Sequence, residues 1–263
     1  MALVDLPQEL FDRILEFLVD EYQALPRLAI VCRAFRAPSQ RRICRTIRII
    51  FPKNPIQCRT RITNIARIIQ EAPHLAKYTK NLIHMAPFGT PSITPNPLLH
   101  CILPHLSSLK RVKLMLSSSD AVTRPLLLAL AKLDLDFLDL SLGSMYPDVL
   151  VDLLPGNMKQ LRLAASPTVC IGKALLPHPA FLLLEELHVV LRATSLATML
   201  PLGRSFPRLS RLIVELAREE DTRQTMLMLG RKGSLPQSLD VFKIVLRGGK
   251  SSFTRLSLWR ILI

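Results

Sequence analysis

Apolar and polar positions alternate with two different periodicities along this chain, and the first is found in residues 1–18. Large apolar residues recur there at three- and four-residue spacing: Leu10, Phe11, Ile14, Leu15 and Leu18. This spacing gathers their side chains along one side of a helix. A helix is therefore predicted from about Pro7 to Leu18, since proline suits a first helical position, where its missing N–H costs nothing.

Two further short helices are predicted before residue 50. Apolar residues on one side of Ala24–Phe35 indicate a second helix, and Pro38 opens a third, arginine-rich helix over Ser39–Arg45. Three short helices make a poor independent core, because they carry more apolar surface than they can hide from one another. We therefore expect a partner, or the rest of this chain, to cover part of that surface.

The second periodicity is a recurring phrase: an apolar residue, two others, and then apolar residues that alternate with other residues. Six copies begin at Leu109, Leu135, Met158, Leu184, Leu209 and Leu239. An earlier copy begins at Cys44, and a blurred one lies around Leu82. The alternation predicts a strand in each copy.

The copies recur at nearly constant spacing. Counted from Val112 to Phe242, successive copies lie 26, 23, 26, 25 and 30 residues apart. Segments of helical character lie between the phrases, at Thr63–Glu71, Pro97–His105, Pro125–Lys132, Pro147–Leu154, Thr194–Leu200 and Thr222–Leu229. A short strand and a helix cannot bury their apolar faces alone, so the units must stack. We predict an α/β fold, a solenoid of short parallel strands with helices on the convex side; an ordinary α/β domain is the alternative.

Charge is distributed unevenly along the chain, whose formal net charge is +15. Residues 1–22 hold six acids and one base, whereas Arg27–Lys80 holds thirteen Lys or Arg and one acid, Glu71. The basic stretch is either solvated surface or a patch for an acidic partner or nucleic acid. Aromatic residues make up only 5% of the chain, which counts against stacking on nucleic-acid bases.

The first part of the chain resembles the F-box family, from about Leu3 to Ile47. The likeness is carried by Leu6-Pro7-x-Glu9-Leu10, Ile14-Leu15-x-x-Leu18 and Leu28-x-x-Val31-Cys32-Arg33-x-Phe35-Arg36, with Phe35 where the family usually has Trp. The resemblance implies a three-helix unit that docks on the Skp-type adaptor of an SCF (cullin–RING) ubiquitin ligase. By position, the implied adaptor-binding residues are Leu6, Pro7, Leu10, Ile14, Leu15, Leu18, Leu28, Val31 and Cys32.

The recurring phrase is similar to the strand of a leucine-rich repeat, whose period is roughly 20–29 residues. The asparagine that usually follows that strand is missing here, so the repeats are irregular. We expect an F-box over residues 1–47 and a leucine-rich-repeat-like domain over residues 48–263. Together the two resemblances imply a substrate-recognition subunit that brings a target protein to the ligase.

The strand face is where we expect the target to bind, since alternate residues of each phrase point away from the core. The predicted target-binding residues are Arg111, Lys113, Phe137, Asp139, Arg162, Glu186, His188, Arg211, Glu215 and Lys243. They mix both signs of charge with apolar side chains. Such a surface suits a protein better than a phosphate backbone, which would want mostly Lys and Arg.

Signatures of catalysis are missing from the sequence. It has no Gly-rich phosphate loop, HExxH, GxSxG or CxxC pair. His100 and His105 are five residues apart, a spacing that does not place both on one face of a helix around a metal. We expect no enzyme and no cofactor. An odd number of cysteines and the lack of a membrane-length apolar run favour the cytoplasm or nucleus. Two alternatives stay open: a basic nucleic-acid-binding protein, and a structural repeat protein whose first helices are only a cap.

Overall fold

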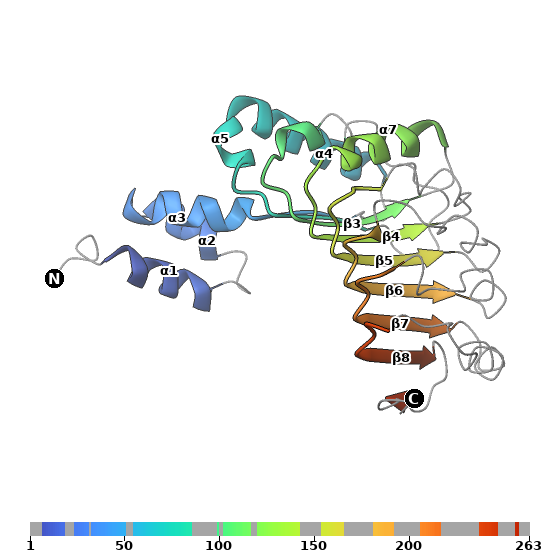
Figure 1. The fold of residues 1–263 in the computed structure, drawn as a ribbon. Helices are drawn as coiled ribbons and strands as arrows, with labels where there is room; N and C mark the ends of the chain where they lie inside the picture. The colour runs from blue at the N-terminus through green and yellow to red at the C-terminus, as the bar shows by residue number, and fades with distance from the viewer. Residues whose placement is uncertain are drawn as a thin grey trace.

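The computed structural model describes residues 7–18, 24–31, 33–50, 55–85, 99, 102–116, 120–142, 154–165, 181–191, 206–216, 237–246 and 256–257. In these residues, nine strands form one sheet whose neighbours follow chain order from β1 to β9. Three helices precede the sheet and lie to one side of it (Figure 1). The predicted fold class is confirmed at this level: the chain is an α/β repeat fold with a solenoid-like stack of strands.

The N-terminal helices are α1 (Gln8–Phe17), α2 (Ala24–Val31) and α3 (Arg33–Cys44). Their limits correct two predictions. The second helix ends at Val31 rather than at Phe35, and Pro38 lies inside α3 instead of opening a helix. Pro38 cannot donate a hydrogen bond to the carbonyl of residue 34, but its ring is buried, so packing offsets part of that loss.

These helices share a small core of their own. It consists of Phe11, Leu15, Leu25 and Phe35, and the rings of Phe11 and Phe35 meet edge to face with centroids 4.7 Å apart. An ion pair between Arg42 and Glu16 (3.0 Å) also joins α3 to α1. The buried residues of the sheet form a separate cluster, so the two parts each have a core among the described residues.

The strands lie where the recurring phrases predict them, including the two early copies. They are β1 (Thr46–Ile50), β2 (Asn81–Met85), β3 (Arg111–Leu116), β4 (Phe137–Leu142), β5 (Gln160–Ala165), β6 (Glu186–Leu191), β7 (Arg211–Leu216), β8 (Val241–Leu246) and β9 (Leu256–Ser257). From β1 to β8 all pairs are parallel, as predicted. The short β9 pairs antiparallel with β8 and was not predicted.

The same backbone contact sets the register at every step between parallel strands. The carbonyl of Lys110, just before β3, accepts hydrogen bonds from the amides of Asp136 and Phe137 (2.9 and 3.1 Å), which open β4. The equivalent carbonyls of the other steps do the same: Arg45, Lys80, Asp136, Lys159, Glu185 and Ser210. Equivalent residues therefore face each other across every pair, although the connections differ in length.

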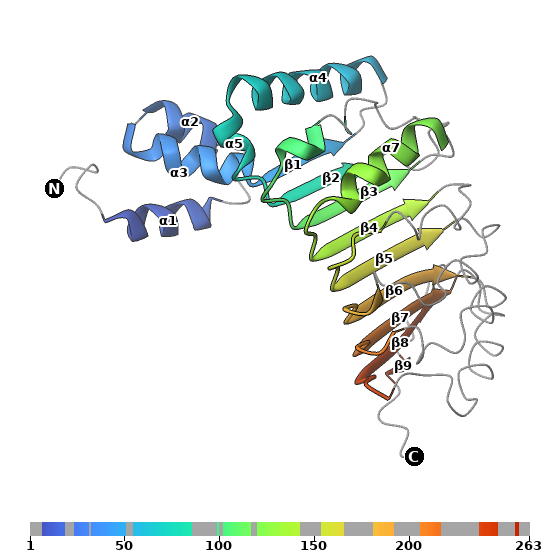
Figure 2. The same ribbon diagram turned by 45° about the horizontal axis from the view of Figure 1, so that its top comes forward.

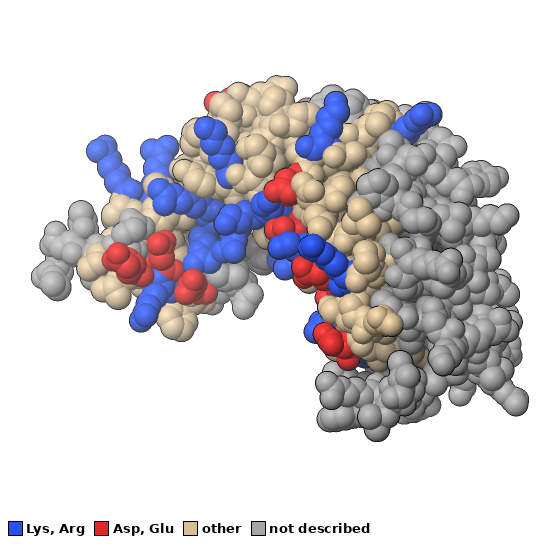
Figure 3. All heavy atoms as spheres, in the orientation of Figure 1, with Lys and Arg blue, Asp and Glu red and all other residues tan. Residues whose placement is uncertain are grey.

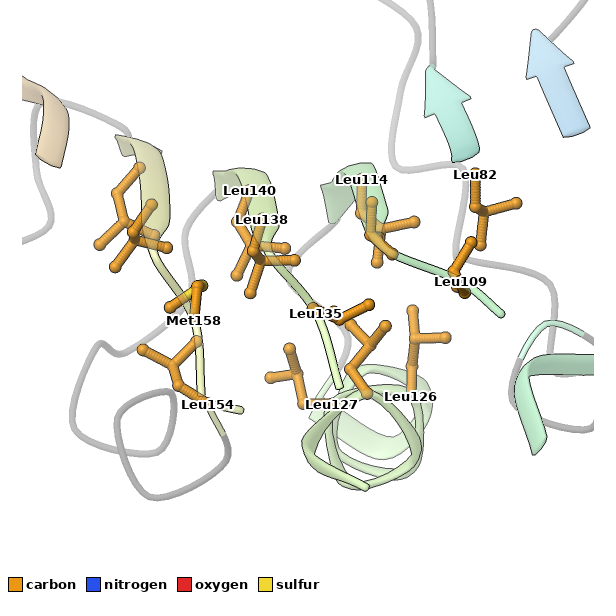
Figure 4. Packing of buried hydrophobic residues seen from close by; sticks show 14 of the residues in the cluster. Leu82, Leu109, Leu114, Leu126, Leu127, Leu135, Leu138, Leu140, Leu154 and Met158 are labelled. Carbon is orange, nitrogen blue, oxygen red and sulfur yellow. The ribbon is translucent and has the colours of Figure 1, made fainter. Parts of the chain in front are cut away.

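Leucines from consecutive repeats fill the core in rows. Leu138 pairs in register with Val112 on one side and Leu161 on the other, and all three are buried. A second row holds Leu140 beside Leu114. Figure 4 shows Leu138, Leu140 and Leu114 above Leu126 and Leu127, which extend from helix α7 toward Leu135. The apolar residues of each recurring phrase therefore point into the core, as the alternation predicts.

Helices lie along one side of the first strands (Figure 2). They are α4 (Pro55–Glu71), α5 (Pro73–Ala76), the 3-10 helix η2 (Leu103–His105) and α7 (Asp120–Ala131). The predicted helical segments at 63–71 and 125–132 are present but begin earlier, so Pro125 lies inside α7. Those predicted at 194–200 and 222–229 lie outside the described residues, as does the one at 147–154 except for Leu154, which is not helical. No helix in the described part of the chain has the length and apolarity to span a membrane.

One inward position of the sheet is a histidine. His84 of β2 stands in the apolar row between Ile49 and Leu114 and is almost fully buried. Burial disfavours the imidazolium and lowers the pKa of His84 to about 4, although hydrogen bonds to the backbone of His84 and Met115 offset part of this effect. The imidazole of His84 is therefore neutral in the folded chain at pH 7.

We expect Leu127→Ala to lower the free energy of unfolding by about 2–5 kcal/mol, because the substitution leaves a cavity under the sheet. Leu128→Ala, on the same helix but exposed, is the matched control and should change it by about 0.5 kcal/mol or less. Urea denaturation measures both. Equal losses in the two variants would contradict the assignment of α7's inner side.

We also expect stability to fall as the pH drops from 6.5 toward 4. In that range the unfolded chain binds a proton at residue 84 that the folded chain does not, so stability is complete above pH 6.5 and decreases by about 3 kcal/mol through the window. Urea denaturation across this pH range should show a smaller slope in His84→Leu. The exposed His105→Gln should behave like the parent chain, and an unchanged slope in His84→Leu would disprove the assignment.

Candidate functional site

The outward side of the sheet carries all ten predicted target-binding residues. Burial alternates along the strands, as in Arg111, Val112 and Lys113, so the polar members share one face. Figure 3 shows Lys or Arg and Asp or Glu side chains interspersed along the inner margin of the curved stack, beside a hollow below the N-terminal helices. We call this surface the strand face.

Charged residues of neighbouring strands pair along the strand face. Lys113, Asp139 and Arg162 are consecutive register partners on β3, β4 and β5. The carboxylate of Asp139 lies 3.3 Å from Nζ of Lys113 and 3.7 Å from Nη1 of Arg162. Asp139 is only 5% exposed, because a cation covers it from each side. The sequence predicts it as a target contact; in the structure its carboxylate pairs with two cations of the neighbouring strands.

The pairing continues across β6 and β7. The carboxylate of Glu215 lies 3.7 Å from Nη2 of Arg162 and 3.3 Å from Nε2 of His188. With Lys113 and Asp139 these residues form one series of polar contacts from β3 to β7, which we call the charge network. Glu186 is engaged nearby, by Arg211 (3.6 Å) and by Nε2 of Gln160 (3.4 Å). Each acid predicted on this face therefore has a basic neighbour.

His188 is held in its neutral form within the charge network. Burial lowers its pKa, and the positive charge of Arg162 lowers it further, whereas Glu215 acts in the opposite direction. Its imidazole is therefore a hydrogen-bonding group at neutral pH rather than a third cation in the network.

An aromatic contact borders the charge network on the side of β3. The guanidinium of Arg111 stacks over the ring of Phe137 on β4, 4.8 Å from its centroid. The two residues are register partners, so the pairing of β3 with β4 brings them together. Arg111 stays exposed while its planar group is held in one orientation.

The residues predicted to bind the adaptor differ in how far they are exposed. Leu10 is 43% exposed and Ile14 36%, whereas Leu15 is fully buried in the small core. Pro7 is exposed, and Leu18 and Leu28 pack partly buried against that core. Leu6, Cys32 and the side chain of Val31 lie outside the described residues.

Two further apolar residues of the N-terminal helices are exposed, and neither was predicted as a contact. Phe17 is 88% exposed on α1, and Ile30 is 85% exposed on α2. Phe17 follows Leu10 and Ile14 by two turns and one turn, so helical periodicity alone could have added it. Ile30 does not belong to the apolar side that was predicted for the second helix, so only the structure shows that it is exposed. We call Leu10, Ile14 and Phe17 the outer stripe of α1.

An apolar pocket of about 230 Å³ lies between α3, β1, α4 and α5. Its lining includes Ile43, Ile47, Ile65 and Leu75. Cys44 also lines it, and burial raises the pKa of this thiol, so the thiol is not activated as a nucleophile. The pocket offers contact to an apolar group but no set of residues for chemistry.

Metal-binding groups are also missing from the described part of the chain, in which no three His, Cys, Asp or Glu side chains are placed to hold an ion. His105 is exposed at the end of η2, and His100 lies outside the described residues. Comparison of the sequence with protein-family models and with curated proteins gives no match.

We expect Asp139→Asn to lower the free energy of unfolding by about 1–2 kcal/mol, since it removes the carboxylate that lies between the cations of Lys113 and Arg162. The matched control is Asp134→Asn, which removes an exposed pair with Lys110 outside the strand face and should have little effect. Chemical denaturation at pH 7 compares them. Equal stability of both variants would show that the charge network does not hold the face together.

Proposed function

We propose that this chain is a substrate-recognition subunit of an SCF ubiquitin ligase. In this proposal its N-terminal helices bind the Skp-type adaptor, and its strand face binds a target protein. The observation that carries the proposal is the outer stripe of α1: an apolar surface on a helix whose inner side already fills a core.

The outer stripe is larger than the helices can cover themselves. Phe11 and Leu15 take the inner side of α1, where Phe35 and Leu25 meet them. Leu10, Ile14 and Phe17 remain on the outer side. Full burial of a large apolar side chain is worth roughly 1.5–3 kcal/mol, so a partner that covers this stripe would gain several kcal/mol. Contiguous apolar surface of this kind is typical of a protein interface.

The F-box-like motif divides in a way that supports this proposal. Leu15 and Phe35 supply the core of the three helices, and Leu10 and Ile14 supply the outer stripe. A motif that serves both a core and an interface needs apolar residues on both sides of a short helix. That requirement explains why α1 is apolar over more than one face.

The alternative that the helices only cap the solenoid fits less well. A cap would lay its apolar side against the end of the strand stack. The small core of the helices is instead distinct from the core of the sheet, and the outer stripe of α1 is exposed.

The repeat region supplies the second half of the proposal. Its parallel strands and leucine rows are those expected of a leucine-rich-repeat-like domain, and its strand face offers charged groups at regular spacing. The acids of this face count against a nucleic-acid partner, since a phosphate backbone favours an unbroken basic surface. A protein target is the better fit.

We expect the wild-type full chain to bind a purified Skp-type adaptor, and Ile14→Asp with Phe17→Asp to weaken that binding at least about tenfold, because two charges enter the apolar contact. The measurement is isothermal titration calorimetry or co-purification of the co-expressed pair. Circular dichroism checks that α1 still forms.

The matched control places the same change on exposed apolar residues elsewhere: Ile68→Asp on α4 with Leu128→Asp on α7. This control should bind the adaptor like the wild type. The proposal fails if the wild-type chain does not bind the adaptor, or if the α1 variant binds as well as the control.

A further inference from the structure

The apolar pocket between α3, β1, α4 and α5 has walls that favour an apolar occupant. Its aliphatic lining residues are Ile43, Ile47, Ile65, Ile68, Ile69 and Leu75. The hydroxyl groups of both threonines that line it are already hydrogen-bonded. Thr79 Oγ1 donates to the carbonyl of Cys44 (2.9 Å), and Thr46 Oγ1 accepts a hydrogen bond from Nδ2 of Asn81 (3.0 Å). A polar ligand would therefore lose hydrogen bonds to water on entry and gain few in return.

The size of the pocket decides what kind of apolar group fits. Its volume is about 230 Å³. An apolar cavity of about 150 Å³ holds one benzene molecule, whereas pockets for drug-sized ligands measure about 300–1000 Å³. The pocket therefore accommodates one aromatic or large aliphatic side chain and is too small for a whole drug-sized molecule.

Two isoleucines leave apolar surface exposed at the pocket. Ile43 of α3 is 42% exposed and Ile68 of α4 is 46% exposed, although both line the pocket. A benzene-sized molecule inside the pocket would leave much of this surface in water. A side chain carried on a peptide segment fills the interior while the segment covers the two isoleucines, so more apolar surface is removed from water. This comparison favours a protein segment over a free small molecule.

The pocket lies apart from the outer stripe of α1 and beside the strand face. In both ribbon views α3 runs between α1 and α5 (Figure 1 and Figure 2), so the outer stripe and the pocket lie on opposite sides of α3. Thr46 and Arg48 of β1 line the pocket as well, and Arg48 belongs to the outward row of Ile83 and Lys113. A segment that continues from the strand face can therefore enter the pocket while another partner covers the outer stripe.

The described charges around the pocket are mostly positive. Arg45, Lys77 and Lys80 each adjoin a lining residue in the chain, and all three are exposed. Within the described part of the chain, none of these three forms an ion pair. Glu71, the one acid of residues 22–119, is already paired with Arg67 (3.9 Å). Figure 3 shows Lys and Arg side chains gathered where the N-terminal helices meet the strand stack, and such a region attracts a partner with acidic residues.

We infer that the pocket anchors one large apolar side chain of the target protein, carried on a segment with acidic residues beside it. The side chain fills the interior, the segment covers Ile43 and Ile68, and its acids lie in the positive field of Arg45, Lys77 and Lys80. Side chains that fill a pocket within a larger contact are typical of the few residues that carry most of the binding energy of an interface. This inference rests on the proposed function, because it takes the anchored protein to be the ligase target.

The test uses the full chain, with and without the Skp-type adaptor, and short dye-labelled peptides in which glutamate and serine alternate around one central residue. The central residue is phenylalanine in the first peptide and alanine in the second. The third peptide keeps phenylalanine but has lysine in place of glutamate. We expect fluorescence anisotropy to show that the first peptide binds at least about tenfold more tightly than either of the others, and that its affinity falls with added salt.

Leu75→Phe is the variant that fills the pocket, because a half-buried leucine of the lining gains a ring. Its matched control is Leu133→Phe, the same enlargement at a half-buried leucine beside α7. The pocket variant should lose affinity for the phenylalanine peptide at least about tenfold, whereas the control should bind like the wild type. Ile43→Ser, at an exposed position that the fold tolerates, should also weaken this peptide, and the equally exposed Leu128→Ser is its control.

The charge around the pocket is tested separately. Arg45→Glu with Lys77→Glu reverses two exposed charges beside the pocket, and Arg124→Glu with Lys132→Glu makes the same change at exposed positions of and beside α7. The first pair should weaken the phenylalanine and alanine peptides by a similar factor, because it acts on the glutamates that both peptides share. The second pair should leave both affinities close to those of the wild type.

The inference is overturned if the phenylalanine and alanine peptides bind alike, if the Leu75 and Leu133 variants bind alike, or if the lysine peptide binds as tightly as the glutamate peptide. Free toluene that binds as tightly as the phenylalanine peptide would assign the pocket to a small molecule instead. Displacement of the peptide by the adaptor would assign it to the adaptor contact. A chain that binds the peptide but not the adaptor refutes only the ligase proposal, and one that binds the adaptor but not the peptide refutes only the inference.

Discussion

The structure depends on one repeated backbone contact. Seven strands, β1 to β7, are each preceded by a residue whose carbonyl accepts two hydrogen bonds. The donors are the first amide of the next strand and the amide just before it. This contact holds β1 to β8 in a common register, and a register slip of one residue would turn every leucine row outward. Burial of the rows then supplies most of the driving force, since their side chains are almost entirely removed from water. The strand face is a product of the same constraint, because it consists of the residues that the register leaves outside.

The register also explains the electrostatics of the face. Residues that are far apart in the chain become neighbours about 4.8 Å apart, so single charges from separate repeats meet as a network. Asp139 stays buried only because Lys113 and Arg162 occupy the same level on the flanking strands. Ion pairs and polar contacts of this kind run from Lys113 on β3 to Glu215 on β7. The distribution of charge over the face, rather than its total, therefore decides where a charged partner can gain free energy.

Sequence predicts the repeat part of this fold well and the contacts within its face poorly. Alternation marks each strand from β1 to β8, because inward positions such as Leu138 must be apolar whatever their neighbours are. Alignment of the recurring phrases gives the register partners on this face, but the side-chain packing that buries Asp139 and stacks Arg111 on Phe137 was not predicted. Pro38 was misplaced for a related reason. Helix limits, and the side of a short helix that is covered, depend on packing partners that periodicity does not identify.

The stacked register turns the strand face into a lattice with two unequal spacings. Steps across the strands are about 4.8 Å, whereas steps along one strand between outward residues are about 6.6 Å. Connections between strands vary in length without altering either spacing, because the backbone contact before each strand absorbs the difference. Individual outward side chains can therefore be exchanged one at a time while their positions stay constant. Such a surface can change its pattern of charged and apolar groups by substitution alone, with no change to the scaffold beneath it.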